Sequence, residues 1–143
     1  MIASINLGAL PIQGLAAADI DVDGTLDLVA GDPAQMGFAV LRGRGNFVFD
    51  PPVRTGSAGA GQAHVAVGDL MKSGAPDVIL AESASDDVAV FKGKNGLSPK
   101  FRTSYNTGKS PSVVRLADLD RDGHLDILTA DANQPSITVV LAP

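Results

Sequence analysis

The chain has 143 residues, of which 45% are hydrophobic and 19% are charged, and its formal net charge is −5. This length and composition predict a single soluble globular domain, and the absence of cysteine excludes disulfides, thiol nucleophiles and Cys-ligated zinc. The acidic charge argues against nucleic-acid binding, and no stretch is apolar for long enough to predict membrane insertion.

The first predicted element is a strand over residues 2–8. Its sequence resembles residues 101–108 in length, in alternation and in its closing glycine. The same segment lacks a basic stretch followed by an apolar one, so it predicts no signal peptide, although an exported mature form would look the same.

Three units follow, each with a strand, an Asp-rich loop and further strands. The expected strands are short, rich in β-branched residues and bounded by Gly, Asp and Pro. They cover residues 15–20, 26–31, 38–41 and 47–54 in the first unit, residues 64–70, 78–81, 88–91 and 100–106 in the second, and residues 113–119, 125–130 and 137–141 in the third. No segment keeps a helical period, so we expect an all-β fold with almost no helix.

The three units align on their acidic loops. Asp19, Asp69 and Asp118 correspond at spacings of about 50 residues, and a glycine recurs five residues after each of them. Four strands repeated about every 40–50 residues are typical of β-propeller blades, which crowd near their axis and need small residues on the innermost strand. We expect three four-stranded blades, the last without its outer strand. The ranges are residues 1–8 for strand four of a blade, and 14–55, 62–107 and 112–143 for the blades.

The first and third loops have the pattern Asp-x-Asp-x-Asp-Gly-x-x-Asp. Carboxylates at alternate positions of a tight turn, with a glycine that permits positive φ, suit Ca²⁺, a hard cation that takes about 6–8 oxygen ligands. Four carboxylates this close repel one another without a cation. We therefore predict about two Ca²⁺ per chain, with a backbone carbonyl from position 7. The predicted ligands are Asp19, Asp21, Asp23, Thr25, Asp27, Asp118, Asp120, Asp122, His124 and Asp126.

Two other interpretations of these loops fit less well. An EF-hand needs a Glu at position 12 and flanking helices, whereas position 12 is Ala30 or Thr129 and both flanks are predicted strands. Asp residues that only cap turns would explain one or two carboxylates, as in the middle loop. There Met71 and Ser73 replace two carboxylates and Lys72 adds a positive charge, so we do not expect metal in the middle loop.

These features resemble the FG-GAP/VCBS-type repeats of integrin-like propellers. The resemblance rests on the Asp loops, on Gly-Ala-Pro-Asp at residues 74–77, and on a hairpin over residues 40–47 that recurs at residues 90–97. It implies a propeller, usually of about seven blades, with Ca²⁺ in the loop that joins strands one and two. The family includes adhesion modules, lectins, surface proteins and non-catalytic enzyme domains, so it implies no single function.

By the same analogy, the loops between strands two and three lie on the face opposite the Ca²⁺ loops, where propeller ligands often bind. Ordinary turn chemistry is the alternative explanation for their polar residues. The candidate ligand contacts, which we expect to be exposed, are Asp32, Gln35, Glu82, Asp86, Asn133 and Gln134. In the matching hairpins, Arg42/Arg44 and Lys92/Lys94 suggest either an anion-binding rim or a solvated edge that resists aggregation.

No catalytic site is predicted. His64 and His124 have no partner visible in the sequence, and neither a Gly-x-Ser-x-Gly elbow nor a Walker loop is present. We expect a non-catalytic module that binds a protein or a glycan. A lectin is the second hypothesis, weakened by the absence of Trp and the single Tyr, and a structural fragment of a longer propeller is the third.

The order of the strands also predicts assembly. The chain begins with an outer strand and ends with a unit that lacks one, so in a two-fold dimer each N-terminal strand can complete the last blade of its partner. Two chains would give six blades, within the usual range of about 4–8, whereas a trimer would need nine. We therefore expect a homodimer, with a trimer as the alternative, in an extracellular or periplasmic location that suits weak Ca²⁺ sites.

Overall fold

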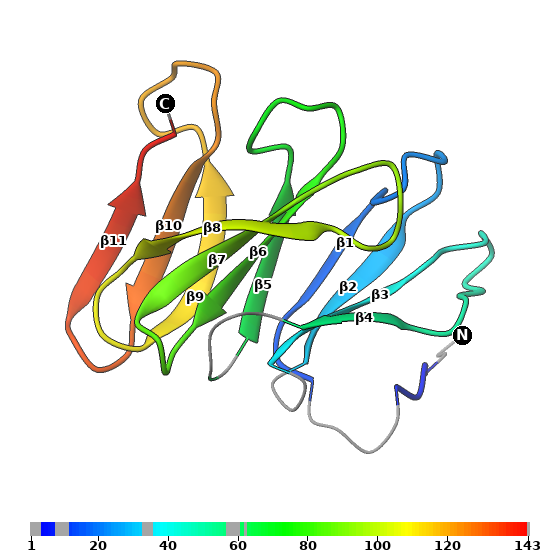
Figure 1. Cartoon of the computed structure of the whole chain (residues 1–143), viewed down its shortest axis with the longest axis horizontal. Helices are drawn as coiled ribbons and strands as arrows, with labels where there is room; N and C mark the ends of the chain where they lie inside the picture. The colour runs from blue at the N-terminus through cyan, green and yellow to red at the C-terminus, as the bar shows by residue number, and fades with distance from the viewer. Residues whose placement is uncertain (1–3, 8–11, 33–35, 57–60, 62, 143) are drawn as a thin grey trace.

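The computed structural model describes residues 4–7, 12–32, 36–56, 61 and 63–142. Within these ranges the chain forms eleven strands and no helix, which confirms the all-β fold class. The strands make three antiparallel sheets that lie side by side (Figure 1). The described part of the chain therefore contains no helix that could cross a membrane.

Sheet one has the strand order β1-β2-β3-β4. Its strands are β1 (Leu15–Ala18), β2 (Asp27–Asp32), β3 (Gly37–Leu41) and β4 (Val53–Gly56). The central strand β3 is buried along its whole length, whereas β1 and β4 alternate between exposed and half-buried residues. The sheet therefore has a buried centre and two more exposed edges.

Sheets two and three repeat this plan. Sheet two has the order β5-β6-β7-β8, and sheet three has the order β9-β10-β11, with no fourth strand among its described residues. The strands are β5 (Ala63–Gly68), β6 (Asp77–Glu82), β7 (Asp87–Lys92), β8 (Lys100–Asn106), β9 (Pro111–Ala117), β10 (Asp126–Asp131) and β11 (Ser136–Val140).

The observed strands begin and end within two residues of the expected ones, except for the outer strand of sheet one. The expected strand over residues 47–54 is wrong, because β4 begins only at Val53. Asn46 and Phe47 adopt positive φ angles of 50° and 60°, so the chain turns there. Phe49 makes only an isolated bridge with Gly43 before the ladder resumes.

The expected N-terminal strand is described only in part. Residues 4–7 form no strand within the single chain, and residues 2, 3 and 8 lie outside the described residues. The segment is tied to sheet one by Arg54, whose Nη2 donates to the carbonyl of Leu7 at 3.1 Å. Pairing of this segment with another chain stays a prediction.

Two hydrophobic cores lie between the sheets, because side chains alternate across each strand. Sheet two contributes to both cores, so β6 is buried throughout. In the core between sheets one and two, the rings of Phe38 and Phe91 meet edge to face, with centroids 5.0 Å apart. That core contains Ile20, Val29, Phe38, Val40, Val65, Val78, Leu80, Ala89 and Phe91. The core between sheets two and three contains Leu70, Ile79, Ala81, Val88, Val90, Val114 and Ile127.

The first strands of the three sheets lie next to one another, since β5 contacts both β1 and β9. Small residues permit this approach. A Cβ on Gly68 would lie 2.8 Å from Leu116 Cδ1 and 3.0 Å from Leu125 Cδ1. The loops that leave these strands are the three Asp loops, and they lie along one edge of the molecule, at the top of Figure 1.

Candidate functional site

All three Asp loops share a framework built on their ninth residue. This residue is Asp27, Asp77 or Asp126, and its side chain is 0–1% exposed. Each carboxylate accepts one N–H from its own loop and one from the turn after the third strand of the sheet, at 2.8–3.0 Å. The donors are Ile20 and Gly43 in sheet one, Met71 and Gly93 in sheet two, and Leu119 and Ala142 in sheet three. The ninth carboxylate therefore fastens the loop to its sheet.

The first residue of each loop also has a structural role. Asp19 accepts the N–H groups of Asp23 and Gly24 at 2.9 and 2.8 Å. Asp69 makes the same two contacts in the middle loop, and Asp118 accepts the N–H of Gly123 at 3.0 Å. Positions one and nine thus accept backbone N–H groups in all three loops, whereas positions three and five carry carboxylates only in loops one and three.

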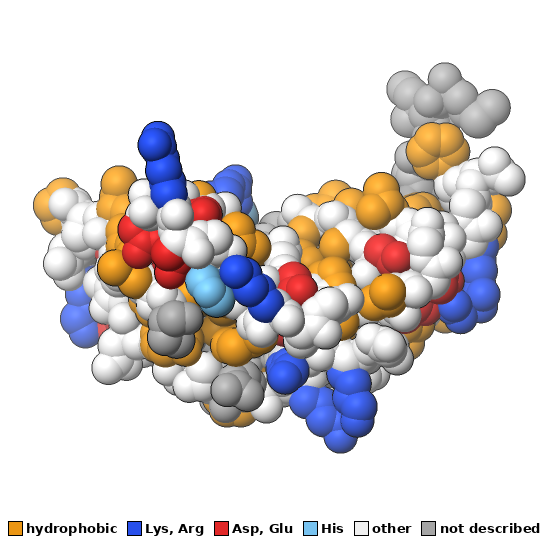
Figure 2. Space-filling view, turned by 90° about the horizontal axis from the view of Figure 1, so that it is seen from above, with side chains coloured by type: hydrophobic (Ala, Val, Ile, Leu, Met, Phe, Trp, Pro, Cys, Tyr) orange, Lys and Arg blue, Asp and Glu red, His pale blue; other side chains and the backbone are white. Residues whose placement is uncertain are grey.

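Two loops bring carboxylates together. One oxygen from each of Asp19, Asp21 and Asp27 lies within 4.8 Å of the others, and Asp118, Asp120 and Asp126 form a second such group. Figure 2, which looks down on this edge, shows acidic side chains gathered in separate patches with hydrophobic side chains between them. Both groups offer only oxygen donors. Ca²⁺, a hard cation, prefers oxygen ligands, whereas softer metals prefer sulfur or nitrogen.

Asp21 has the environment that best fits a cation. Its side chain is 10% exposed, and within the described chain its buried Oδ1 has no hydrogen-bond partner. Burial, followed by the negative charge of Asp27, raises the pKa of the Asp21 carboxyl. A buried oxygen without a donor, beside two other carboxylates, costs free energy that a hard cation would relieve. The residues of loop one therefore fit Ca²⁺.

The fifth position of each acidic loop is not part of the group. Asp23 Oδ1 accepts the N–H of Thr25 at 2.8 Å, and Asp122 Oδ1 accepts the N–H of His124 at 2.7 Å. The structure thus brings together three of the four carboxylates that the sequence predicts as ligands in each loop.

Loop one also holds a basic side chain. Arg42 follows β3, and its Nε lies 2.8 Å from Asp21 Oδ2 while its Nη2 lies 2.6 Å from Asp23 Oδ2. The hydrogen bond from Arg42 lowers the pKa of Asp23, and the N–H of Thr25 lowers it further. The sequence predicted Arg42 only as part of a rim or a solvated edge. Its contact with the Asp loop follows from the hairpin that folds back over that loop.

The middle loop forms no acidic group among the described residues. Met71, at position three, packs against the core between sheets two and three. Ser73, at position five, donates its hydroxyl to the carbonyl of Ala75 at 3.3 Å. Whether the middle loop binds metal stays a prediction.

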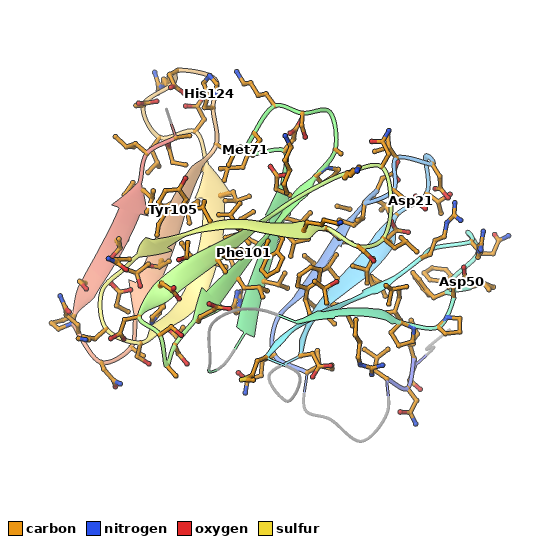
Figure 3. The ribbon with its side chains drawn as sticks, viewed as in Figure 1. Asp21, Asp50, Met71, Phe101, Tyr105 and His124 are labelled. Carbon is orange, nitrogen blue, oxygen red and sulfur yellow. The ribbon has the colours of Figure 1, made fainter. Side chains whose placement is uncertain are left out.

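A small hollow lies between sheets two and three, close to the Asp loops. Its volume is about 130 Å³, below the range of about 300–1,000 Å³ that is usual for small-molecule sites. Figure 3 shows Met71 and His124 on neighbouring loops above Tyr105. The lining residues are Leu70, Met71, Tyr105, His124, Ile127, Val140, Leu141 and Ala142. The sequence did not single out this hollow. The alternation of β8, which turns Tyr105 toward sheet three, is the signal that could have found it.

The expected exposure of two candidate ligand contacts is wrong. Asp32 and Glu82 are only 1% and 4% exposed. Each is the last residue of a second strand, where the next strand and its turn cover it. Asp32 Oδ2 also pairs with Arg54 Nε at 3.2 Å. Both carboxylates are therefore buried instead of facing solvent, and that of Asp32 links β2 to β4.

The remaining candidates divide into three cases. Asp86 Oδ2 pairs with Lys109 at 2.6 Å and its Oδ1 accepts the N–H of Ser110 at 2.8 Å. The hydrogen bond from Lys109 is the main cause of the lowered pKa of Asp86. Asn133 and Gln134 are exposed, as expected, and Gln35 lies outside the described residues. Binding of a ligand by any of them stays a prediction.

His64 lies on β5 and is half-buried. Its Nδ1 is buried and finds no hydrogen-bond partner in the described part of the chain. Burial, and then the charge of Arg115, lowers the pKa of His64. His124 instead lines the hollow between sheets two and three.

Comparison with known proteins identifies the repeat. A family model for the FG-GAP-like repeat matches residues 19–80 and residues 69–129. Each match begins at the first Asp of a loop and runs into the second strand of the next sheet. Searches of curated proteins and of solved structures gave no match.

Proposed function

The chain belongs to the FG-GAP-like repeat family, and we propose that it is a non-catalytic interaction module stabilised by Ca²⁺. The ion would be held in loop one by Asp19, Asp21 and Asp27 and in loop three by Asp118, Asp120 and Asp126, the two groups whose oxygens converge. Asp23, Asp122 and the carbonyls of Thr25 and His124 are the further ligands that the loop pattern offers. Bound Ca²⁺ would neutralise each group and fix the loop to its sheet.

The observation that carries this proposal is the buried Asp21 Oδ1 without a partner. Turn capping explains positions one and nine, since the middle loop uses them in the same way. It does not explain a carboxylate at position three that is 10% exposed and lies within 4.8 Å of two others. A cation does explain it, because a buried oxygen without a partner is costly and Arg42 contacts only the other oxygen of Asp21, Oδ2.

We further propose that the three sheets are blades of a β-propeller. Adjacent first strands, a middle sheet whose second and third strands are buried, and Asp loops along one edge support this arrangement. Such a rigid scaffold presents loops on both faces for recognition of a protein or glycan. Weak calcium loops suit an extracellular or periplasmic location, where Ca²⁺ is abundant, and an interaction role needs no catalytic group.

We also propose that two copies close a six-bladed ring. Within the described residues β11 has no outer neighbour, whereas the equivalent strands β3 and β7 pair with β4 and β8. The segment over residues 2–8 resembles β8 in length, alternation and closing glycine. Supplied by a second copy, it would complete sheet three by strand addition.

Calcium titration of chelator-treated protein by isothermal titration calorimetry tests the metal proposal. We expect two sites per chain, with Kd on the order of 10⁻⁴–10⁻³ M if they follow extracellular modules. Asp21→Ala should remove one site and Asp120→Ala the other. Ser73→Ala, a truncation at an exposed position of the middle loop, should leave both.

The same samples should melt at lower temperature in chelator. Calcium at 100 times its Kd stabilises the folded state by about 2.7 kcal/mol per site. Binding that survives in the Asp21→Ala/Asp120→Ala double variant, or the absence of any uptake by the unmodified chain, would refute the metal proposal.

A further inference from the structure

Three residues occupy one equivalent position in the three sheets. In each sheet the residue after the ninth-position Asp pairs with a residue of the third strand. The residue that follows this partner in the chain is Arg42, Lys92 or Leu141. The residue that follows each of them donates its N–H to the ninth-position Asp. The register therefore fixes this equivalence independently of any alignment of the sequence.

The two acidic loops differ at this position. In sheet one Arg42 lies between Asp21 and Asp23: its Nε forms an ion pair with Asp21 Oδ2 at 2.8 Å, and its Nη2 donates to Asp23 Oδ2 at 2.6 Å. In sheet three the same position is Leu141, which is 57% exposed. No basic side chain of the described chain forms an ion pair with Asp118, Asp120 or Asp122.

We infer that Arg42 is an internal cation that competes with Ca²⁺ for loop one. This inference rests on the proposed calcium function. When Ca²⁺ binds, the guanidinium either gives up its bonds to two ligand carboxylates or stays beside the ion and repels it, and both outcomes weaken binding. Without Ca²⁺, the same bonds offset the repulsion between carboxylates and keep the loop folded.

Arg42 replaces the metal only in part. It satisfies Asp21 Oδ2, whereas Asp21 Oδ1 stays buried without a partner and Asp19 and Asp27 receive no charged donor. With Arg42 in place, Asp21 Oδ1 is therefore still an acceptor that a second cation could contact. Because this acceptor is left over, Arg42 is a competitor that keeps the loop folded until Ca²⁺ binds, and it is not a permanent replacement for the ion.

The test isolates each loop in the full chain. In an Asp120→Asn background, which leaves loop one, Arg42→Leu should tighten Ca²⁺ binding about three- to tenfold, the range expected for loss of a partly exposed charged pair. In an Asp21→Asn background, which leaves loop three, Leu141→Arg should weaken binding by a similar factor, because it transplants the competitor. Calorimetry with Ca²⁺ alone measures both.

Arg44→Leu is the matched control. It removes the same charge from the same hairpin, but Arg44 pairs with Asp50 outside the loop. Figure 3 shows Asp50 on the connection between β3 and β4, whereas Asp21 lies on the loop between β1 and β2. A tighter loop one in both arginine variants would mean that net charge alone is responsible, and would overturn the inference.

A second readout does not depend on bound metal. In chelator, Arg42→Leu should melt at lower temperature than Arg44→Leu, because of these two residues only Arg42 forms ion pairs with the carboxylates of loop one. Unchanged affinity in Arg42→Leu, with two sites in the unmodified chain, refutes the inference and leaves the calcium proposal standing. If neither the unmodified chain nor Arg42→Leu takes up Ca²⁺, both the inference and the calcium proposal are refuted.

Discussion

Asp77 accepts hydrogen bonds from Met71 and Gly93 in a loop whose third and fifth positions carry no carboxylate. Its side chain is fully buried. Asp77→Ala leaves both amides without an acceptor, so we expect a loss of about 2–4 kcal/mol in the free energy of unfolding. Urea unfolding should give the same loss with Ca²⁺ and with chelator.

Asp77→Asn is the companion variant, because its amide oxygen still accepts one of the two N–H groups. It should lose less stability than Asp77→Ala. A loss that appears only when Ca²⁺ is present would contradict a structural role for the ninth position.

At the scale of single residues, the sequence predicted what local spacing determines. Alternating carboxylates and a glycine with positive φ identify the loops, and the replacements at Met71 and Ser73 identify the broken one. Contacts between distant residues were beyond this reasoning. Arg42 reaches Asp21 and Asp23 only because the hairpin after β3 folds over the loop, and Asp32 is buried only because neighbouring strands cover it.

At the scale of elements, the hairpin after β7 depends on close packing of backbone. A Cβ on Gly93 would lie 2.1 Å from the carbonyl oxygen of Pro76 and 2.9 Å from that of Ala75. Backbone cannot yield as a flexible side chain does, so Gly93→Ala must shift the hairpin and strain the bond to Asp77. We expect a loss of about 1–3 kcal/mol, the usual cost of overpacking, measured by thermal unfolding in chelator.

Gly96→Ala is the matched control in the same connection. Its Cβ would meet only the carbonyl of Lys94, at 3.3 Å, so a small shift accommodates it. Equal losses in the two variants would show that chain entropy, and not the contact with Pro76, sets the cost.

The equivalent connection after β3 shows where the prediction of the strands succeeded and where it failed. Most strands are short apolar runs whose bounds are visible in the sequence. The start of β4 was not, because the positive φ angles of Asn46 and Phe47 extend the turn through residues that look like strand. Gly45 and Asn46 are typical turn residues, but Phe47 is not, so the sequence did not show how far the turn extends.

At the scale of the whole molecule, the outer faces of sheets one and three carry apolar side chains. Ile137 and Val139 of β11 are 71% and 44% exposed, and Leu15 of β1 is 64% exposed. Ile5 and Leu7 line a hollow of about 320 Å³ beside Leu15. The segment that we propose to complete a partner's sheet three therefore already lies on the outer face of sheet one, where that sheet would pack.

This arrangement predicts a dimer that depends on both partners of the contact. Light scattering of the full chain should give twice the mass of one chain. Deleting residues 1–7 should leave β11 unpaired and expose its edge, so the protein should dissociate, aggregate or unfold. Ile137→Lys should also disrupt the dimer, because it buries a charge between the sheets. Met36→Lys places the same charge at an exposed turn that belongs to neither β1 nor β11 and should leave the dimer intact. A folded monomer of the full chain, or a ring of three copies, would contradict the dimer.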